Sequence, residues 1–304
     1  MKLKNYDLKS LFQAGICKEY AISLKPIEEG EKVSLLSDSM FKTMFQNENR
    51  LKYSCKFLSL FLDATYEELL NNIQLAKNEV DKKHERDKGE RCDYVAAIKG
   101  TYVNIEVNNN SSLEVMERNI EYITKLYAKK VKIGSRYEYT PSISFNLNNF
   151  SIKGNDKIID IYGVQNSEGV LLTDKIIIVQ IYIPNLRKKW YNEGIESLNE
   201  AEKYILALVE MDIEKLKSLG GEELMEEYVK EAEEVSFEGG VGESYDKEWA
   251  LKDQAYRDGK DEGREEGSTT KAIEIARNLL KNKVDISIIA QSTGLSIDEI
   301  KSLI

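Results

Sequence analysis

Two short segments near the middle of the chain show the clearest alternation of apolar and polar residues. RCDYVAAI ends at Ile98, TYVNIEVN begins at Thr101, and only Lys99 and Gly100 separate them. A period of two is typical of strands with one buried face, and a two-residue connection that contains glycine favours a tight β-turn. The pattern therefore predicts a β-hairpin over residues 91–108.

Apolar residues at helical spacing come before this hairpin. In SDSMFKTMF, Asp38 is placed to cap a helix whose apolar positions include Met40, Phe41 and Phe45. A second, strongly apolar helix is expected over Tyr53–Leu62. A strand over Ile73–Val80 and a charged loop over residues 81–91 then lead into the hairpin.

A helix and further strands are expected after the hairpin. Ser111 and Ser112 end the strand and begin a helix that runs to about Val131. Three more strands follow, at Pro141–Leu147, Lys157–Val164 and Lys175–Ile183. The resulting fold class is α/β, with a mixed sheet of about five or six strands flanked by helices.

The C-terminal part is predicted to be helical. One helix is expected over Glu196–Leu219 and a second, acidic helix over Glu222–Glu234, followed by the Gly-rich stretch SFEGGVGES. The chain is thus divided into an N-terminal extension (1–36), a core (37–220), an acidic helix and linker (221–244) and a helical interaction region (245–304). In the last region Gly259, Gly263 and Gly267 recur every four residues. They either allow close helix packing or mark a frayed linker.

Charge is distributed unevenly between these parts. Residues 221–304 hold 21 acidic and 11 basic side chains, and residues 1–220 hold 32 of each, so the net charge of −10 lies in the tail. A neutral core with local basic clusters is compatible with nucleic-acid binding. Three cysteines without paired spacing argue against a disulfide framework and a zinc site, and no apolar signal region is present at the N-terminus. These features predict a cytoplasmic protein.

The hairpin brings two acids together. If Lys99-Gly100 is a two-residue turn, Ile98 lies opposite Thr101, and counting back places Asp93 opposite Glu106. Directly opposed side chains lie about 4.5–5.5 Å apart at Cβ, so like charges there destabilise a sheet. A hard divalent cation such as Mg²⁺ or Mn²⁺ reverses that effect because it takes oxygen ligands. Asp93 and Glu106 are therefore candidate metal ligands.

Asn108 lies beside Glu106 on the same strand face, and the same count places Arg91 opposite Asn108. The alternative for this face is an ordinary solvated surface with alternating charges, and a slip of the register would separate the two acids.

This ordered set of motifs resembles the PD-(D/E)XK nuclease superfamily, and more narrowly the recombination-promoting nuclease and putative transposase family. The matching pieces are SDSMFKTMF, VNIEVN, Arg118 to Tyr122 with Tyr127, GSRYEYTPSISF, and the tail EGREEG…IARNLL…IAQSTGLSIDEI. They span most of residues 33–304. The resemblance implies a restriction-endonuclease-like core that cleaves DNA with Mg²⁺ or Mn²⁺, and it suggests Asp38 as a third catalytic acid.

One departure from the family pattern concerns Asn108. The superfamily usually has lysine two residues after the glutamate, and this family often has glutamine. Asparagine can orient a water molecule but carries no charge, so Arg91 or Lys42 is expected to offset charge on the phosphate. The departure also leaves open a rival function, in which the nuclease fold has lost activity and serves as a binding or regulatory module.

Several further residues are candidates for nucleic-acid contact. Arg118 and Tyr122 lie one helical turn apart, and basic residues gather at the end of the same helix, among them Lys129 and Lys130. Lysine and arginine in such positions bind phosphate groups without sequence preference. They also favour a helix C-terminus through its dipole. Arg187, Lys188, Lys189 and Trp190 form a second basic patch that is open to the same two interpretations.

The last two predicted helices resemble a helix-turn-helix in their spacing around Gly294. The second of them carries Asp298 and Glu299 and a single basic residue, Lys301. Acidic side chains are repelled by phosphates, so the tail is expected to mediate protein contacts, with homo-oligomerisation as the favoured form. Its apolar positions, Ile273, Ile275, Leu279, Leu280, Ile288, Ile289 and Ile300, suggest a surface too large to leave exposed.

Overall fold

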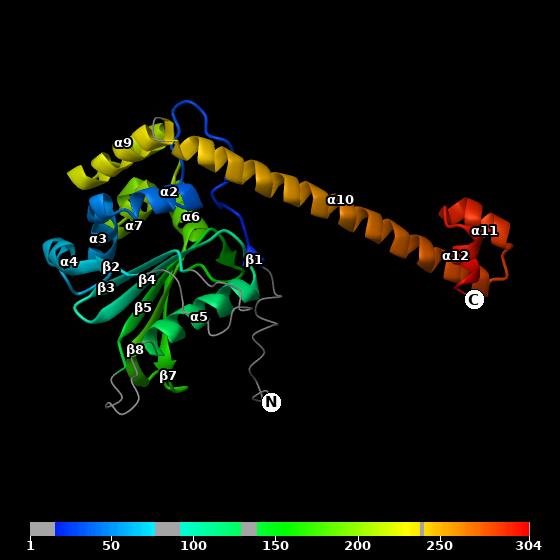
Figure 1. Cartoon of the computed structure of the whole chain (residues 1–304), viewed down its shortest axis with the longest axis horizontal. Coiled ribbons are helices and arrows are strands. Elements are labelled where there is room, and N and C mark those ends of the chain that lie inside the picture. Colours follow the sequence, from blue (N-terminus) through cyan, green and yellow to red (C-terminus); the bar gives the residue numbers. More distant parts are fainter. Residues whose placement is uncertain (1–15, 77–91, 129–138, 238–239, 304) are drawn as a thin grey trace. The chain divides into compact units, whose positions relative to one another are not determined.

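The computed structural model describes residues 16–76, 92–128, 139–237 and 240–303, which belong to two compact units, residues 1–246 and 247–304. The first unit is built on a six-stranded mixed sheet of order β2-β3-β4-β5-β8-β7 (Figure 1). Its strands are β2 (Ile73–Leu75), β3 (Tyr94–Ile98), β4 (Thr101–Asn108), β5 (Ser142–Asn148), β7 (Ile159–Gln165) and β8 (Leu171–Tyr182). The predicted α/β class with flanking helices is confirmed.

The hairpin of β3 and β4 has the predicted register. Lys99 and Gly100 both have positive φ angles, 45° and 85°, as a two-residue turn of the primed kind requires. Ile98 pairs with Thr101, and the pairing continues to Tyr94 opposite Ile105. The turn therefore fixes which side chains of the two strands share a face.

The sheet changes from antiparallel to parallel at β4. β4 pairs with β5, and β5 with β8, both in parallel, whereas β7 lies antiparallel to β8 at the edge of the sheet. A parallel pair needs a long crossover, and the helix α5 (Leu113–Ala128) lies in the connection between β4 and β5. A separate two-stranded sheet joins β1 (Ile16–Cys17) to β6 (Ser151–Ile152).

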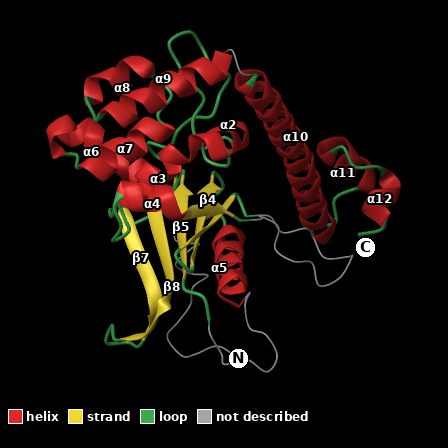
Figure 2. Cartoon of the chain, turned by 60° about the vertical axis from the view of Figure 1, so that its left-hand side comes forward, coloured by secondary structure: helices red, strands yellow, loops and turns green. Residues whose placement is uncertain are grey.

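Helices gather at one end of the strands, whereas α5 lies alongside them (Figure 2). The gathered helices are α2 (Asp38–Met44), α3 (Leu51–Ser59), α4 (Tyr66–Asn72), α6 (Ile183–Glu193), α7 (Glu200–Val209), α8 (Ile213–Leu219) and α9 (Glu223–Phe237). The apolar face of the hairpin, with Val103 and Ile105, joins them in one core that also includes Phe145 and Leu147. Burial of these side chains holds β4 and β5 in place, and their other face carries the polar residues.

The predicted single helix over Glu196–Leu219 is wrong. The chain forms a short 3₁₀ turn at Ile195–Ser197 and then two helices, α7 and α8, separated at residues 210–212. Asp212 caps α8 by accepting a hydrogen bond from the Lys215 amide at 3.1 Å, and the Met211 carbonyl accepts one from the Lys32 amide at 2.8 Å. An extended N-terminal segment thus pairs with the backbone where the helix is interrupted, a contact between distant parts of the chain.

The stretch SFEGGVGES is not a linker along most of its length, contrary to prediction. α9 continues to Phe237, and α10 (Val241–Lys281) begins only a few residues later. A Cβ on Gly242 would lie 2.3 Å from the Ser236 carbonyl oxygen, so glycine is required here for a close approach. Gly259, Gly263 and Gly267 all lie within α10, so this part of the tail is helical.

The start of α2 also differs from the prediction. Ser37, not Asp38, is the cap, because its hydroxyl accepts a hydrogen bond from the Met40 amide at 3.2 Å. Asp38 is the first residue of the helix, where its carboxylate forms an ion pair with Lys42. This position leaves the Asp38 side chain in solvent, with 57% of its area exposed.

The C-terminal unit has a small apolar core of its own. The end of α10 packs with α11 (Ile286–Thr293) and α12 (Ile297–Lys301) around Ala276, Ile289 and Ile300. The expectation of a large exposed apolar surface is therefore only partly met, because Ile289 and Ile300 are buried within the unit, while Ile288 keeps 53% of its area exposed. Within the described parts of the chain, no helix is both long and apolar enough to cross a membrane.

Candidate metal and nucleic-acid site

Asp93 and Glu106 lie together where the antiparallel hairpin meets the parallel strands. Asp93 directly precedes β3, and Glu106 is in the second half of β4. The Glu106 carboxylate accepts a hydrogen bond from the Asp93 amide at 3.1 Å, and the Asp93 carboxylate accepts one from the Val107 amide at 2.9 Å. Each acid is thus held by the backbone of the other's strand, so the two carboxylates are positioned before any ligand arrives.

Helix α2 supplies the surroundings of Asp93. Gln46, just after the helix, donates a side-chain hydrogen bond to the Asp93 carbonyl. The charges of Asp38 and Lys42 are both close enough to change the pKa of Asp93, the first raising and the second lowering it. The three acids of the sequence prediction are therefore near one another, with Asp38 at the exposed side.

Burial disfavours the charged forms of both central acids. Burial, together with the neighbouring charge of Asp93, raises the pKa of Glu106 to about 8, and burial is the larger of the two causes. Burial also raises the pKa of Asp93, although the hydrogen bond from Val107 and the charge of Arg118 oppose this. Two buried carboxylates this close together repel each other when both are charged. A bound cation would remove that repulsion, so the site is suited to one.

Asn108 is part of a line of polar side chains. Its amide oxygen accepts a hydrogen bond from the Arg118 guanidinium at 3.3 Å, and its amide nitrogen donates to Asn148 at 2.9 Å. Asn148 in turn donates to Gln180 at 2.7 Å. Both ends of the Asn108 amide are thus engaged, and in this conformation it holds Arg118.

The polar face of the hairpin is buried, unlike the solvated surface considered as an alternative. Glu106 has 1% of its area exposed, and Asn104 and Asn108 have 0% and 2%. The same face continues on β5 through Ser144, which lies opposite Asn104. The helix α5 covers this layer. Polar groups that are buried away from water need hydrogen-bond partners, so the side chains of this layer depend on one another for their hydrogen bonds.

The donor atoms present fit a hard divalent cation. Over residues 16–76, 92–128, 139–237 and 240–303, no group of three or more His, Cys, Asp or Glu side chains is placed to hold a metal ion. A cation at this site would therefore rest on two carboxylates, with amide, backbone and water oxygens completing its coordination. Mg²⁺ and Mn²⁺ accept such all-oxygen sets, and Mg²⁺ usually keeps several waters. The buried Asn146 amide, which has no hydrogen-bond partner in the described part of the chain, lies on the same face and agrees with this composition.

The predicted nucleic-acid contacts other than Lys42 divide into three groups. Arg118 is exposed on α5, and its charge lowers the pKa of both acids, so it lies at the site. Tyr122 is buried to 5% exposure beneath it, in a cluster with Val95, and the Arg118 guanidinium lies 5.7 Å from its ring centroid. Tyr122 therefore packs into the protein and lies beneath Arg118. Three predicted contacts lie outside the described residues: Arg91, Lys129 and Lys130.

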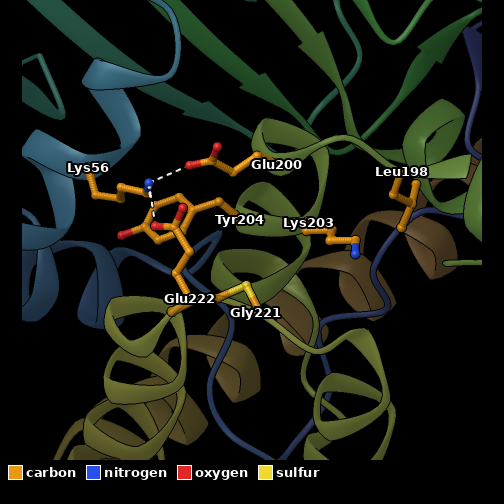
Figure 3. A pocket seen from close by; sticks show the side chains of 8 residues that line it. Lys56, Leu198, Glu200, Lys203, Tyr204, Gly221 and Glu222 are labelled. Carbon is orange, nitrogen blue, oxygen red and sulfur yellow. Dashed lines mark hydrogen bonds and ion pairs between the residues drawn. The ribbon is translucent and has the colours of Figure 1, made fainter. Parts of the chain in front are cut away.

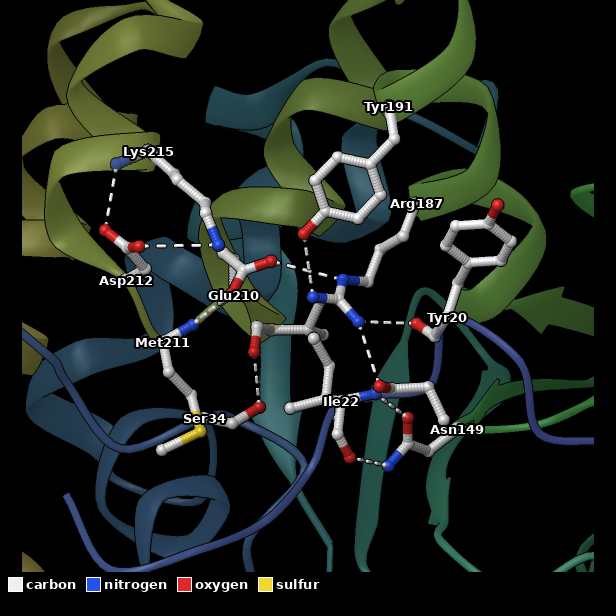
Figure 4. Close-up of polar contacts among 12 residues, drawn as sticks. Tyr20, Ile22, Ser34, Asn149, Arg187, Tyr191, Glu210, Met211, Asp212 and Lys215 are labelled. Atoms are coloured by element: carbon white, nitrogen blue, oxygen red, sulfur yellow. Dashed lines mark hydrogen bonds and ion pairs between the residues drawn. The ribbon is translucent and has the colours of Figure 1, made fainter.

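The second basic patch is largely neutralised within the protein. Figure 4 shows the Arg187 guanidinium between Glu210 and the Tyr20 backbone carbonyl, to both of which it donates hydrogen bonds. Lys189 pairs with Glu202 at 2.7 Å and Lys188 with Asp156 at 3.2 Å. These contacts give Arg187 a structural role, because they attach the N-terminal segment to α6.

A cavity of about 270 Å³ is lined by residues of α3, α7 and α9 and of the segments that precede α7 and α9 (Figure 3). Its polar lining is dominated by Lys56, whose ammonium group forms ion pairs with Glu200 and with Glu222, the latter at 2.7 Å. Neither Asp93 nor Glu106 lines it. The charge of Lys56 in this cavity is thus compensated by two carboxylates.

Sequence reasoning missed the residues that neighbouring strands bring to the site. Asn146, Asn148 and Gln180 all lie on the carboxylate face of β5 and β8. A signal was present, because SISFNLN alternates polar and apolar residues with the same period as VNIEVN. Gln46 had no such signal, since its contact is with a distant backbone carbonyl.

Comparison with known protein families gives two matches. A family described as PD-(D/E)XK nuclease family transposase matches residues 35–261, and the C-terminal HTH domain of the Rpn/YhgA-like nuclease family matches residues 269–304. The first match includes the hairpin, α5 and the polar strands. Searches of curated proteins and of solved structures gave no match.

Proposed function

The chain belongs to the PD-(D/E)XK nuclease family transposases, whose match covers more than half of it, and from this premise we propose that it is a divalent-metal-dependent DNA endonuclease. The observation that carries the proposal is the pair of buried carboxylates, Asp93 and Glu106, held by reciprocal backbone hydrogen bonds. The family favours DNA as the substrate, and a connection with recombination or mobile elements follows from the transposase relationship.

The residues of this chain have distinct roles in the proposed reaction. Asp93 and Glu106 would hold Mg²⁺ or Mn²⁺, which supplies Lewis-acid activation of the scissile phosphate and lowers the pKa of an attacking water. Arg118 offers a guanidinium to the phosphate oxygens and replaces the charge that asparagine at position 108 lacks. Asn108 orients Arg118, and Gln46 fixes the backbone of Asp93. Asp38 would be the third acid of the site, and Lys42, which pairs with it at the exposed side, would face the phosphate.

Metal binding in the absence of DNA tests this proposal most directly. We expect the protein to bind Mn²⁺ and Mg²⁺ in calorimetry, and we expect Glu106→Ala to lose that binding. Since burial and the Asp93 charge raise the pKa of Glu106 to about 8, a cation must displace a proton at lower pH. The affinity is therefore expected to rise by roughly tenfold per pH unit up to about pH 8 and to level off above it.

The matched control for this measurement is Glu114→Ala, an acid in the exposed first turn of α5. It is expected to bind metal as the parent does. A parent protein that binds neither cation would instead support the alternative function, a nuclease fold without catalysis that serves as a binding module.

We further propose that the C-terminal unit mediates self-association. α10 exposes two large apolar side chains, Leu251 at 74% and Tyr256 at 70%. In the unit's last helix Glu299 is engaged in a capping box with Ser296, and Asp298 is exposed. Exposed apolar side chains favour contacts with protein, and acidic side chains are repelled by phosphates.

Deleting residues 250–304 tests this assignment and retains Tyr245, whose hydroxyl donates to the Lys25 carbonyl in the first unit. We expect light scattering to show a smaller oligomer and DNA affinity to stay unchanged, because the deleted residues carry 10 acidic and 9 basic side chains and the acidic stretch before them is kept. A truncated protein that keeps its oligomeric state and loses DNA affinity would show that the helix-turn-helix domain binds DNA.

A further inference from the structure

Most buried amides on the carboxylate face form at least one hydrogen bond, including Asn104, whose nitrogen donates one although its oxygen has no partner among the described residues. The Arg118, Asn108, Asn148 and Gln180 side chains form a continuous line of hydrogen bonds, and Asn104 donates to Ser144 at 3.2 Å. This is the usual state of polar groups inside proteins, since an unpaired buried donor or acceptor costs about 1–3 kcal/mol. An exception within such a layer therefore requires an explanation.

Asn146 is such an exception. Its side chain is fully buried, and among the residues that the structure describes neither its amide oxygen nor its amide nitrogen has a hydrogen-bond partner. Asn119 on α5, with 1% of its area exposed, has the same property and approaches the sheet from the helix side. Two unpartnered amides in one buried layer indicate a place for a ligand or an ordered water between α5 and the sheet.

The register of the sheet shows what lies beside Asn146. It pairs with Glu106 across the parallel strands β4 and β5, so both side chains are on the same face. Neighbouring strands are about 4.8 Å apart, which is close enough for a carboxylate and an amide oxygen to bind one cation. Asn146 also has an advantage over a third acid, because it adds an oxygen without adding charge to a pair that already repels.

We infer that the side-chain oxygen of Asn146 is a third protein ligand of the divalent cation held by Asp93 and Glu106. This inference rests on the proposed metal-dependent function and extends its ligand set to the next strand. It also accounts for the absence of a hydrogen-bond partner, since an amide that hydrogen-bonds within the sheet would not be available to coordinate. The amide nitrogen of Asn146 then remains available to donate a hydrogen bond to water.

The test measures binding of Mn²⁺ and Mg²⁺ to the full chain without DNA, by calorimetry and by the rise in melting temperature. Asn146→Ala is expected to weaken binding at least about tenfold, the scale on which even outer-shell contacts act. Ser144→Ala is the control, because Ser144 lies on the same strand face two residues earlier, beside Asn104 and not beside Glu106. It is expected to bind metal within about twofold of the parent, a difference too small to indicate a lost ligand.

A second variant distinguishes the loss of a metal ligand from a loss of folding. Asn146→Leu replaces the unpartnered amide with an apolar group of similar size, so in EDTA it should melt at or above the parent's temperature, while its metal-induced stabilisation falls. Metal affinity equal to the parent's in both Asn146 variants would overturn the inference. It would also be overturned if Asn146→Ala and Asn119→Ala lowered the melting temperature equally and neither changed metal binding. If the parent itself binds no metal, the proposed function fails, and the inference fails with it.

Discussion

Replacing Glu106 with glutamine is expected to lower Mg²⁺-dependent DNA cleavage by about a thousandfold or more. Loss of one carboxylate from a two-acid site removes most of the cation's affinity, and a cation contributes several kcal/mol to the stabilisation of a phosphoryl transition state. Asp93→Asn is expected to act in the same way, because the two carboxylates form a single site. Single-turnover cleavage of plasmid and linear DNA, with Mg²⁺, with Mn²⁺ and in EDTA, measures the effect.

Glutamine is chosen because it resembles the neutral form of Glu106. With a pKa raised to about 8 by burial and by Asp93, that carboxyl is mostly protonated at neutral pH without metal, so the variant should fold like the parent. Glu114→Gln, an exposed change on α5, should cleave at the parental rate. Cleavage in EDTA at the rate seen with Mg²⁺, or full activity in both acid variants, would be incompatible with the proposed mechanism.

Arg118→Gln is expected to reduce cleavage by about a hundredfold while leaving the fold intact. Removing one preorganised donor from a site of developing charge has an effect of this order. The side chain is exposed and bonded to Asn108, so its loss creates no cavity. Because the Arg118 charge lowers the pKa of both acids, its removal should also move the rise of activity to higher pH.

Two matched variants give this prediction its specificity. Arg118→Lys keeps the charge but not the planar donor pair, and we expect it to recover part of the rate and to restore the pH profile. Lys42→Gln, which removes an exposed cation that is already paired with Asp38, should have a much smaller effect. A parental cleavage rate in Arg118→Gln would assign the cationic role to another residue.

The hairpin was predictable because its information is local. A two-residue turn with glycine sets the register, and the register places Asp93 near Glu106 without any knowledge of the rest of the fold. The family and the mixed α/β class were also confirmed, since both depend on the order of motifs along the chain. The capping residue of α2 was misassigned by one position, because Ser37 and Asp38 are both good caps and only the backbone conformation distinguishes them.

Contacts between distant segments account for what the sequence did not reveal. The break between α7 and α8 depends on pairing with residues near Lys32, and the burial of the polar strand face depends on α5. Tyr122 looked like a surface residue beside Arg118, yet the same helix turns it toward Val95. Periodicity shows which residues share a face, but the neighbour that covers that face is decided by tertiary packing.

The junction of antiparallel and parallel pairing at β4 has a consequence for the order in which the protein folds. Asp93 and Glu106 are 13 residues apart and meet through a tight turn, so their contact forms on the fast timescale of a hairpin. Residues 40 apart, such as Asn108 and Asn148, meet only after the crossover through α5 has closed, and such non-local parallel pairings form slowly. A nascent chain therefore presents its two acids before the amide layer is assembled around them.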